Sequence, residues 1–504
     1  MLLQIDIIFP FIIFPLALSL WLFAYAIRSL VFLFVSIFKG SKVFLYTASK
    51  LPDVAEADNL CTCDATMYKG RRTSINNHII ENNNVQRDIR MITYIKSNTS
   101  MSLPFVSILV ATYNEQLVIT RLMKSCATLS YDRERFEIIV IDDSQDDTFD
   151  ILKEWKQKLP NLKVLHRGDR IGWKGGALNL ALKNMDNRSS FVLVLDADNI
   201  LVNDTLEKFI TCFVNSDLNE KHIDLIQGYP ISGVFCSNYD DNTNKDRGKN
   251  DSHIDLRVGD RFNWIARGID FRLAKRNLIE FLAKNFMNLP IQITGSLFMI
   301  RSEIIKSIGF SQDLTEDWDL TLDLYLSYSN NESIVKKRKI IFYPLLISYC
   351  EATTKFKEYF KQRMRVSEGH IRGLKRNTLR ILTSKISYID KIELLFTGLQ
   401  YAKSIGIIGL IIIDYMLLST NGVDFIMHNY FLKILLFVQF VSFLIIIGTN
   451  FISISLCRNI RNYSIKDALY SMSLDVYSMP AFILGSILGL SRRKGIFYKT
   501  ERNP

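Results

Sequence analysis

The chain has 504 residues, with 62 Lys or Arg against 51 Asp or Glu, and therefore a formal charge of +11. Its 48% apolar and 22% charged residues exclude a disordered chain, and 23 Gly and 10 Pro exclude collagen-like and Pro-rich classes. Seven Cys without a Cys-x-x-Cys pair support neither a disulfide framework nor a zinc site. Reduced thiols in the cytoplasm are therefore expected, in a chain long enough for two to four domains.

Apolar residues gather at both ends of the chain and predict membrane-spanning helices. The N-terminal span covers about residues 7–38, and its first 21 residues carry no charge, enough to cross a hydrocarbon core of about 30 Å. Further spans are expected at about 394–418 and 434–456. Lys39 and Lys42 follow the first span, so the positive-inside rule places the N-terminus outside and the next segment in the cytoplasm.

The last apolar stretch, about residues 468–490, differs from the others because it carries Asp475 and Pro480 and has basic flanks. We predict an interfacial or re-entrant segment that starts and ends in the cytoplasm, with a fourth full span as the alternative. The chain is thus expected to be a multi-pass protein of the cell membrane with a cytoplasmic catalytic domain. Its membrane regions would be residues 1–49 and 376–504, the latter ending in a basic tail.

Between these regions, residues 50–103 are polar and Asn-rich and are interpreted as a linker. From residue 104 to about 375, short apolar strands alternate with helix-like segments. This alternation predicts an α/β domain with a mostly parallel sheet between helices. The strands are expected at 106–111, 137–142, 162–166 and 191–195, and the first helices at 115–129 and 147–158.

Acidic residues follow three of these strands, where ligands of parallel sheets bind. They are Glu115, the pair Asp142-Asp143, and the motif Asp196-Ala197-Asp198. An Asp-x-Asp motif lets two carboxylates leave a strand end together, which suits a hard divalent cation that holds a diphosphate. Taken alone, the motif is weak evidence for a metal site, because solvated acidic turns are common after strands.

Two further motifs carry charge at predicted helix starts. Lys174-Gly175-Gly176 would present a cation and backbone N–H groups to an anion, although an ordinary Gly-rich helix entry has the same sequence. Glu316, Asp317 and Asp319 crowd three carboxylates into four residues, which tends to raise one pKa and suits a general base. The alternative is an acidic helix N-terminus that the helix dipole favours.

Taken in order, these motifs resemble family 2 glycosyltransferases. The closest resemblance is to the membrane-integrated branch that includes cellulose, mannan and hyaluronan synthases. It rests on six motifs: Val110-Ala-Thr-Tyr-Asn-Glu115, Ile141-Asp-Asp-Ser144, Lys174-Gly-Gly-Ala-Leu-Asn179, Asp196-Ala-Asp198, Thr315-Glu-Asp317 and Gln362-Arg-Met-Arg365. The resemblance implies a GT-A fold, a UDP- or GDP-linked sugar donor, and Mg²⁺ or Mn²⁺ as cofactor.

The resemblance also implies roles for individual residues. Asp317 would be the catalytic base of an inverting transfer, with Glu316 as the second candidate. Asp198 would hold the metal, and Asp196 would face the ribose and share the metal site. The nucleotide would further contact Glu115, Asp143, Asp142 and Lys174. The diphosphate would lie under Gln362, Arg363 and Arg365, and the acceptor would contact Gly295, Ser296 and Trp318.

One departure from the family pattern affects the product. The family's last motif ends in Trp, which helps to hold the acceptor's terminal sugar, and Val366 stands at that position here. Trp264 and Trp318 are the candidates to replace it. Three spans also hardly enclose a polymer channel. Lys403 and Asp414 lie three turns apart on one helix face, where they could line a polar path or pair with other helices.

Three functions are therefore considered. The first is transfer of sugars to a growing polysaccharide, and the second is transfer of one or a few sugars to a lipid or lipid-linked acceptor. The third is an inactive relative that acts as a membrane scaffold, which the filled acidic positions disfavour. The expected partners are the nucleotide sugar, the glycan or lipid-linked acceptor and the bilayer, without nucleic acid. Oligomerisation is left open.

Overall fold

The computed structural model describes residues 2–50, 103–233, 263–327, 338–458, 461–491 and 495. The side chains of residues 2–13, 41–50 and 420–428 are outside this description. The predicted linker at 50–103, apart from its end residues, and the basic tail at 492–494 also lie outside the described residues.

An eight-stranded mixed sheet forms the centre of the catalytic domain, in the order β3-β2-β1-β4-β7-β6-β8-β5. The strands are β1 (Phe105–Thr112), β2 (Phe136–Asp142), β3 (Leu162–His166), β4 (Ser189–Asp196), β5 (Ile200–Leu201), β6 (Leu225–Gly233), β7 (Phe298–Arg301) and β8 (Ile340–Glu351). Strands β1 and β2 are buried almost throughout, as expected for strands covered by helices on both faces.

The predicted mostly parallel sheet is confirmed, since four of the seven strand pairs are parallel, and the antiparallel pairs are those that involve β7 and β5. Strands β3, β2, β1 and β4 pair in parallel, whereas β7 runs antiparallel to both β4 and β6. Strand β8 is parallel to β6, and β5 is antiparallel to β8. Because β7 enters the sheet against β4, the loop before β7 arrives beside the carboxyl end of β4.

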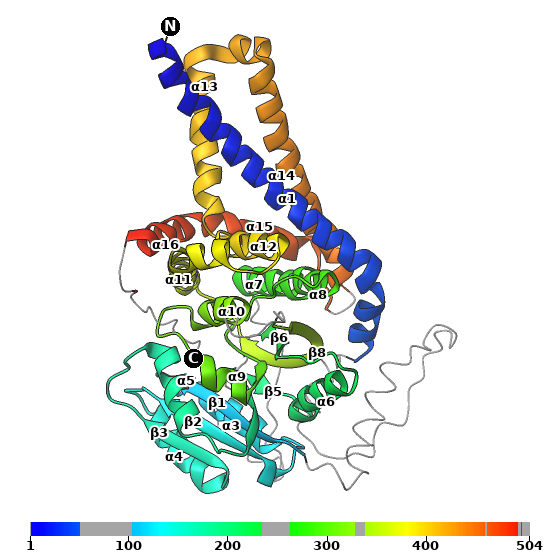
Figure 1. The fold of residues 1–504 in the computed structure, drawn as a ribbon, viewed down its shortest axis with the longest axis vertical. Coiled ribbons are helices and arrows are strands. Elements are labelled where there is room, and N and C mark those ends of the chain that lie inside the picture. Colours follow the sequence, from blue (N-terminus) through cyan, green and yellow to red (C-terminus); the bar gives the residue numbers. More distant parts are fainter. Residues whose placement is uncertain are drawn as a thin grey trace, which may run out of the picture.

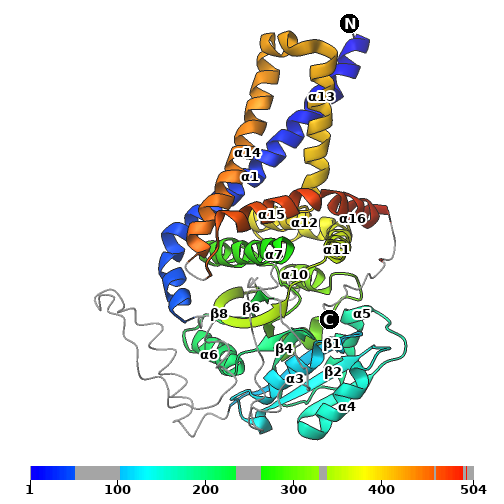
Figure 2. The ribbon, with the colours of Figure 1, turned by 180° about the vertical axis from the view of Figure 1, so that it is seen from behind.

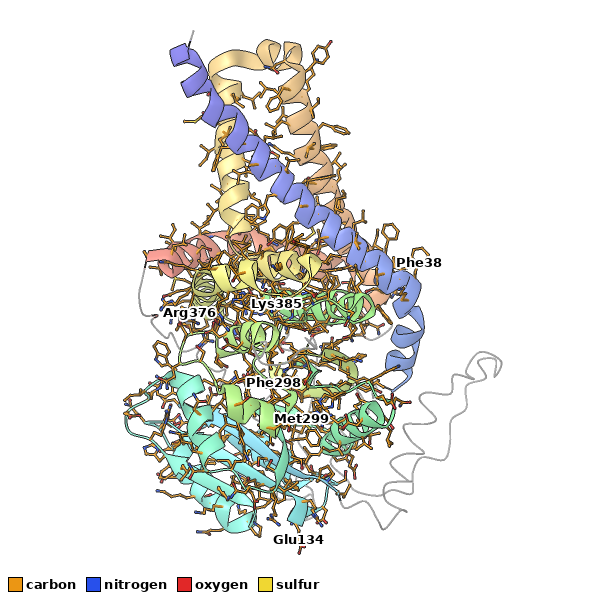
Figure 3. All side chains as sticks on the ribbon, viewed as in Figure 1. Phe38, Glu134, Phe298, Met299, Arg376 and Lys385 are labelled. Atoms are coloured by element: carbon orange, nitrogen blue, oxygen red, sulfur yellow. The ribbon has the colours of Figure 1, made fainter. Side chains whose placement is uncertain are left out.

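Helices surround this sheet. They are α3 (Ile119–Ala127), α4 (Thr148–Lys158), α5 (Trp173–Lys183), α6 (Thr205–Leu218), α7 (Trp264–Lys275), the π-helix η3 (Arg276–Phe281), α8 (Leu282–Met287), α9 (Ser302–Ile308), α10 (Glu316–Leu326) and α11 (Phe356–Thr383). In Figure 1, α7, α8, α10 and α11 lie between the sheet and the apolar helices. Figure 3 shows Phe298 and Met299 of β7 inside the domain, where both are buried.

The apolar helices project from one side of this domain. Helices α1 (Leu2–Lys50), α13 (Lys403–His428) and α14 (Tyr430–Cys457) extend away from the sheet (Figures 1 and 2). Two segments of the described chain are long and apolar enough to cross a membrane singly, Phe14–Gly40 and Tyr430–Cys457. Phe38 projects outward from α1 and is 78% exposed, as suits an apolar side chain that faces lipid (Figure 3).

The predicted span at about 394–418 coincides with two helices that are separated by a bend. Helix α12 (Tyr388–Gly398) ends inside it, and α13 begins at Lys403 after a bend of 73°. Helix α12 carries Asp390, Lys391 and Glu393, charges that favour a position along the domain over one within lipid. Together the two helices are long and apolar enough to form one broken span, of which α13 is the more apolar part.

The stretch predicted to be interfacial or re-entrant forms two helices, α15 (Ile465–Tyr477) and α16 (Met479–Ser491), bent by 43°. They lie across the base of the projecting helices, beside α12 (Figures 1 and 2). Helix α16 packs closely on α11, where the Ser367 hydroxyl donates to the Phe482 carbonyl (2.9 Å). A Cβ atom on Gly485 would collide with the α11 backbone at Met364, so this approach requires glycine.

Two polar residues of α13, Lys403 and Asp414, contact other helices. The Lys403 ammonium lies 6.0 Å from the centre of the Tyr25 ring of α1. Asp414 interacts with Gln439 of α14, which donates to Ser19 of α1 (3.0 Å). Of the two interpretations of Lys403 and Asp414, pairing between helices is the one the contacts support.

Candidate active site

The predicted site residues meet around one cavity of about 410 Å³ at the carboxyl ends of β1, β4 and β8. All but two of them line it. The lining members are Glu115, Asp143, Lys174, Asp196, Asp198, Gly295, Ser296, Glu316, Asp317, Gln362, Arg363 and Arg365. The exceptions are Asp142 and Trp318.

Lys174 connects three of the motifs. Its Nζ lies 2.6 Å from Asp196 Oδ1 and 3.1 Å from Glu316 Oε1, and it donates to the Gly295 carbonyl (2.8 Å). Burial alone would lower the pKa of Lys174, but Asp196 and Glu316 raise the pKa above its usual value. The side chain is thus a fixed cation in the cavity. Its position at the start of α5 follows from Gly172, whose φ of +71° turns the chain into the helix.

Asp317 lies in the first turn of α10, and its Oδ1 accepts from the Trp318 backbone N–H (2.8 Å). Burial and the neighbouring Glu316 carboxylate raise the pKa of Asp317 to about 7, against the opposing effect of Lys174. A carboxylate with this pKa can take up a proton near neutral pH, which is the property of a general base.

The loop before β7 brings Gly295 and Ser296 beside these acids. Gly295 has a φ of +78°, and a Cβ atom there would lie 3.2 Å from Asp317 Oδ2. The Ser296 hydroxyl accepts from the Asp196 backbone N–H (2.9 Å) and donates to Asn199 Oδ1. Ser296 therefore fixes the end of β4, and Gly295 leaves space next to the carboxylate of Asp317.

The far end of the cavity carries the residues predicted to bind the nucleotide base. Asp143 forms a bidentate ion pair with Arg167 (2.7 and 2.5 Å). Nearby, the Arg170 guanidinium stacks 3.3 Å from the centre of the Tyr113 ring, and both side chains line the cavity. A flat cation on an aromatic ring beside Glu115 provides a surface on which a base can stack.

Asp142 does not belong to this surface, and its prediction as a nucleotide contact is wrong. The side chain is fully buried and accepts from Thr112 (2.8 Å) and Ser144 (2.5 Å), with His166 Nδ1 at 2.8 Å. Its carboxylate joins the ends of β1, β2 and β3 and has no surface left for a ligand.

Asp196 and Asp198 could supply two carboxylate ligands to a divalent cation, which needs further ligands to complete its shell. The Asp196 side chain is 41% exposed in the cavity, and Asp198 Oδ2 accepts from the Glu351 backbone N–H (3.2 Å). Within the described residues, no group of three His, Cys, Asp or Glu side chains is arranged around a common point. Two carboxylates suit Mg²⁺ or Mn²⁺ when phosphate oxygens and waters complete the shell.

Helix α11 carries the last motif along the edge of the cavity. Arg363 lies 5.2 Å from the centre of the Tyr359 ring, and its Nη2 donates to Gln362 Oε1 (3.1 Å). Later glycines bring α11 against α10, since a Cβ atom on Gly373 would lie 2.8 Å from the Trp318 ring. Gln362 and Arg365 line the same cavity wall.

The prediction of Trp318 as an acceptor contact is wrong. Its ring is fully buried and stacks on His370 of α11 (centroids 5.0 Å apart, 6° between planes), so it packs the core that carries the acids. Trp264 packs against Tyr477 of α15 and does not line the cavity either.

Aromatic and basic residues without a recognisable motif complete the cavity. They are Arg170, Arg272, Arg276, Tyr359, His370 and Tyr401. Tyr401 comes from the turn between α12 and α13, and its ring meets His370 edge to face (5.0 Å). No local spacing identifies these residues, because α7, α11 and the α12–α13 turn meet only in the folded chain.

The sheet combines parallel strands with the antiparallel strand β7, and carboxylates lie at the strand ends where a diphosphate can bind. This is the architecture of nucleotide-sugar transferases of GT-A fold. The domain is of this class. Residues 107–306 match the model of the family described as Glycosyl transferase family 2.

The chain is similar to several known proteins. It is 41% identical over 114 residues to a beta-monoglucosyldiacylglycerol synthase of Nostoc sp., covering 22% of this chain and 24% of that one. It is 28% identical over 272 residues to the probable glycosyltransferase YdaM of Bacillus subtilis, covering 53% and 56%. The solved mannosyltransferase PcManGT of Pyrobaculum calidifontis, in complex with GDP-Man and Mn²⁺, aligns over 90% of this chain and 100% of that one (14% identity, TM-score 0.48). The chain thus covers less than two thirds of the length of these curated relatives.

Proposed function

We propose that the protein is an inverting membrane glycosyltransferase that moves a sugar from a nucleoside-diphosphate donor to a lipid or lipid-linked acceptor. One observation carries this proposal. The cavity that contains Lys174, Asp196 and Asp317 is also lined by Tyr401, two residues before the apolar helix α13 begins. A donor can bind at the sheet while an acceptor reaches the same cavity from the membrane side.

The residues divide the chemistry between them. The Asp317 carboxylate takes the proton of the acceptor hydroxyl, and the acceptor oxygen attacks the anomeric carbon opposite the diphosphate. The bond from that carbon to the diphosphate breaks, and the nucleoside diphosphate leaves with the electron pair. Lys174, Arg363 and Arg365 line the same cavity and would stabilise the charge that develops on the leaving group.

Asp198 and Asp196 would hold Mg²⁺ or Mn²⁺, which when bound supplies further positive charge against the diphosphate. Arg170 and Tyr113 would stack on the base of the nucleotide, with Glu115 and Asp143 beside them.

The number of long helices supports a lipid product over a polymer. The described chain has two single spans, or up to four if each bent pair is one span. So few helices hardly enclose a channel for a sugar polymer. The similarity to a synthase named for glucosyldiacylglycerol is in keeping with a lipid acceptor.

The test uses full-length protein in lipid bilayers with a panel of labelled UDP- and GDP-sugars, followed by sizing of the products. A single organic-extractable product supports the proposal. A ladder or high polymer would favour the polysaccharide function, and no consumption of any donor would favour an inactive scaffold.

A further inference from the structure

The membrane side of the cavity carries positive charge that protein carboxylates do not balance. Arg272 and Arg276 line this wall, and Lys275 lies next to Arg276 in sequence. Arg272 pairs with Asp475 of α15. Within the described chain, no carboxylate oxygen lies within 4.0 Å of the charged groups of Lys275 or Arg276.

Arg276 is the clearest of these cations. Its Nε is buried and has no hydrogen-bond partner among the described residues, and the guanidinium lies 5.6 Å from the centre of the Phe281 ring. Glu280 is nearby, but it is already paired with Arg28 (2.8 Å) and Lys284 (3.0 Å). A buried guanidinium with an open N–H is a site for an anion, because unpaired buried charge is costly.

The position of Arg276 indicates which anion. Arg276 lines the cavity together with Tyr401, and its helix η3 packs on α1, where the Ser36 hydroxyl donates to the Ile279 carbonyl (2.8 Å). The residues expected to hold the donor come instead from α5 and the end of β4, as Lys174, Asp196 and Asp198 do. We therefore assign the anion at Arg276 to the acceptor.

The surroundings indicate that this acceptor comes from the bilayer. Ile269 and Leu273 of α7 line the cavity one helical turn before the basic residues, and Tyr401 lies beside the start of α13. Lys275 Nζ contacts Asn450 of α14, one of the single spans (2.5 Å). The basic wall thus borders the membrane helices directly.

We infer that the acceptor is a membrane lipid whose headgroup carries a phosphate beside a free hydroxyl, with Arg276 binding the phosphate and Asp317 deprotonating the hydroxyl. This inference rests on the proposed function and specifies its acceptor. A guanidinium binds phosphate through two parallel N–H···O contacts, which would also orient the hydroxyl. The new bond joins the headgroup oxygen to the anomeric carbon, Asp317 receives the proton, and the nucleoside diphosphate leaves.

The test compares acceptors in vesicles of phosphatidylcholine that contain either phosphatidylglycerol or diacylglycerol, with soluble glycerol phosphate as a third arm. Transfer of label to lipid and release of nucleotide are both measured. We expect labelled phosphatidylglycerol at a rate at least about 10-fold above the other two acceptors. Equal or faster transfer to diacylglycerol would overturn the inference, as would preference for soluble glycerol phosphate or a glycan ladder.

Substitutions at Arg276 test the residue itself. Arg276→Gln should raise the KM for phosphatidylglycerol about 10-fold and lower the ratio of transfer to nucleotide release, and Arg276→Lys should restore part of both. Arg188→Gln, an exposed arginine outside the cavity, is the matched control. Equal losses of transfer and nucleotide release in Arg276→Gln would overturn the assignment. If the unmodified protein consumes no donor in any vesicle, the proposed function itself fails.

Discussion

Gly295 stands directly against the carboxylate of Asp317. A Cβ atom on Gly295 would lie 3.2 Å from Asp317 Oδ2 and 3.6 Å from Lys174 Nζ. The backbone of Gly295 also accepts the hydrogen bond of Lys174, so the loop fixes the cation while it leaves the base uncovered. Its φ of +78° is one that residues with a side chain rarely adopt.

Gly295→Ala should therefore damage catalysis more than folding. The positive φ costs about 1–2 kcal/mol of stability, and the added methyl group must push Asp317 by a few tenths of an ångström. Since a misplacement of about 1 Å can cost about 10²-fold in rate, we expect kcat to fall about 10-fold. Steady-state kinetics and thermal unfolding measure the two effects, and an unchanged kcat would show that Asp317 does not act at this face.

Asp317→Asn should remove the base and keep the donor site. Transfer should fall by about 10²-fold or more, the scale of general-base catalysis, while the Kd for the nucleotide sugar changes little. Asp323→Asn in the same helix, where the carboxylate pairs with Arg380 outside the cavity, should leave both values unchanged. Near-normal turnover of Asp317→Asn would transfer the role of base to Glu316.

The pH dependence of kcat should report the same carboxylate. Burial and Glu316 raise the pKa of Asp317 to about 7, so it is protonated and inactive below this pH and becomes a base above it. We expect kcat to rise between about pH 6 and pH 8, and this rise to be absent in Asp317→Asn. The charged groups that act on Asp317 are Glu316, Lys174, Asp196, Arg276 and Arg365. A profile identical in both proteins would assign the titration to another group.

Asp198→Ala should abolish the metal dependence of donor binding. A hard cation here needs both carboxylates and the diphosphate as ligands. Without Asp198, the only remaining carboxylate ligand is Asp196, which is already paired with Lys174. Calorimetry with Mn²⁺ and UDP or GDP should show metal-enhanced binding in the unmodified protein and none in the variant. Asp186→Ala, at an exposed ion pair with Arg188, is the control. Metal-enhanced binding that persists in Asp198→Ala would contradict this ligand assignment.

The sequence predicts the acidic strand ends well because they are local. The ends of β1, β2 and β4 carry their acids directly after buried runs, and parallel pairing brings these ends to one edge. Asp142 and Asp143 show the limit of this reasoning. They are adjacent and chemically identical, yet one faces the cavity and the other is enclosed by Thr112, Ser144 and His166.

The membrane side of the site could not be predicted because it is assembled from distant segments. Tyr401 reaches the cavity because the chain bends by 73° between α12 and α13. The sequence gives no sign of this bend, since the apolar residues from 394 onward predict one continuous span. Arg276 likewise has no motif around it, and it lies at the start of the π-helix η3, where the extra residue in the turn changes the direction of the side chains.

Val366 remains the position that should govern product length. It lines the cavity between Arg365 and the buried part of α11, and the aromatic rings in the same wall are Tyr359 and Tyr401 in place of Trp264 or Trp318. Tyr359 contacts Arg363 and Arg272, while Tyr401 contacts the rings of His370 and Phe482.

Val366→Trp should therefore lengthen the product without abolishing transfer, because a large ring beside the arginines could stack on a terminal sugar and retain it for a further cycle. Val366→Ala should keep the short product. Parallel measurement of nucleotide release and product size separates the two roles of the residue. We expect product size to change more than nucleotide release in Val366→Trp, while equal losses in both readouts with no change in size would mean that Val366 only positions Arg365.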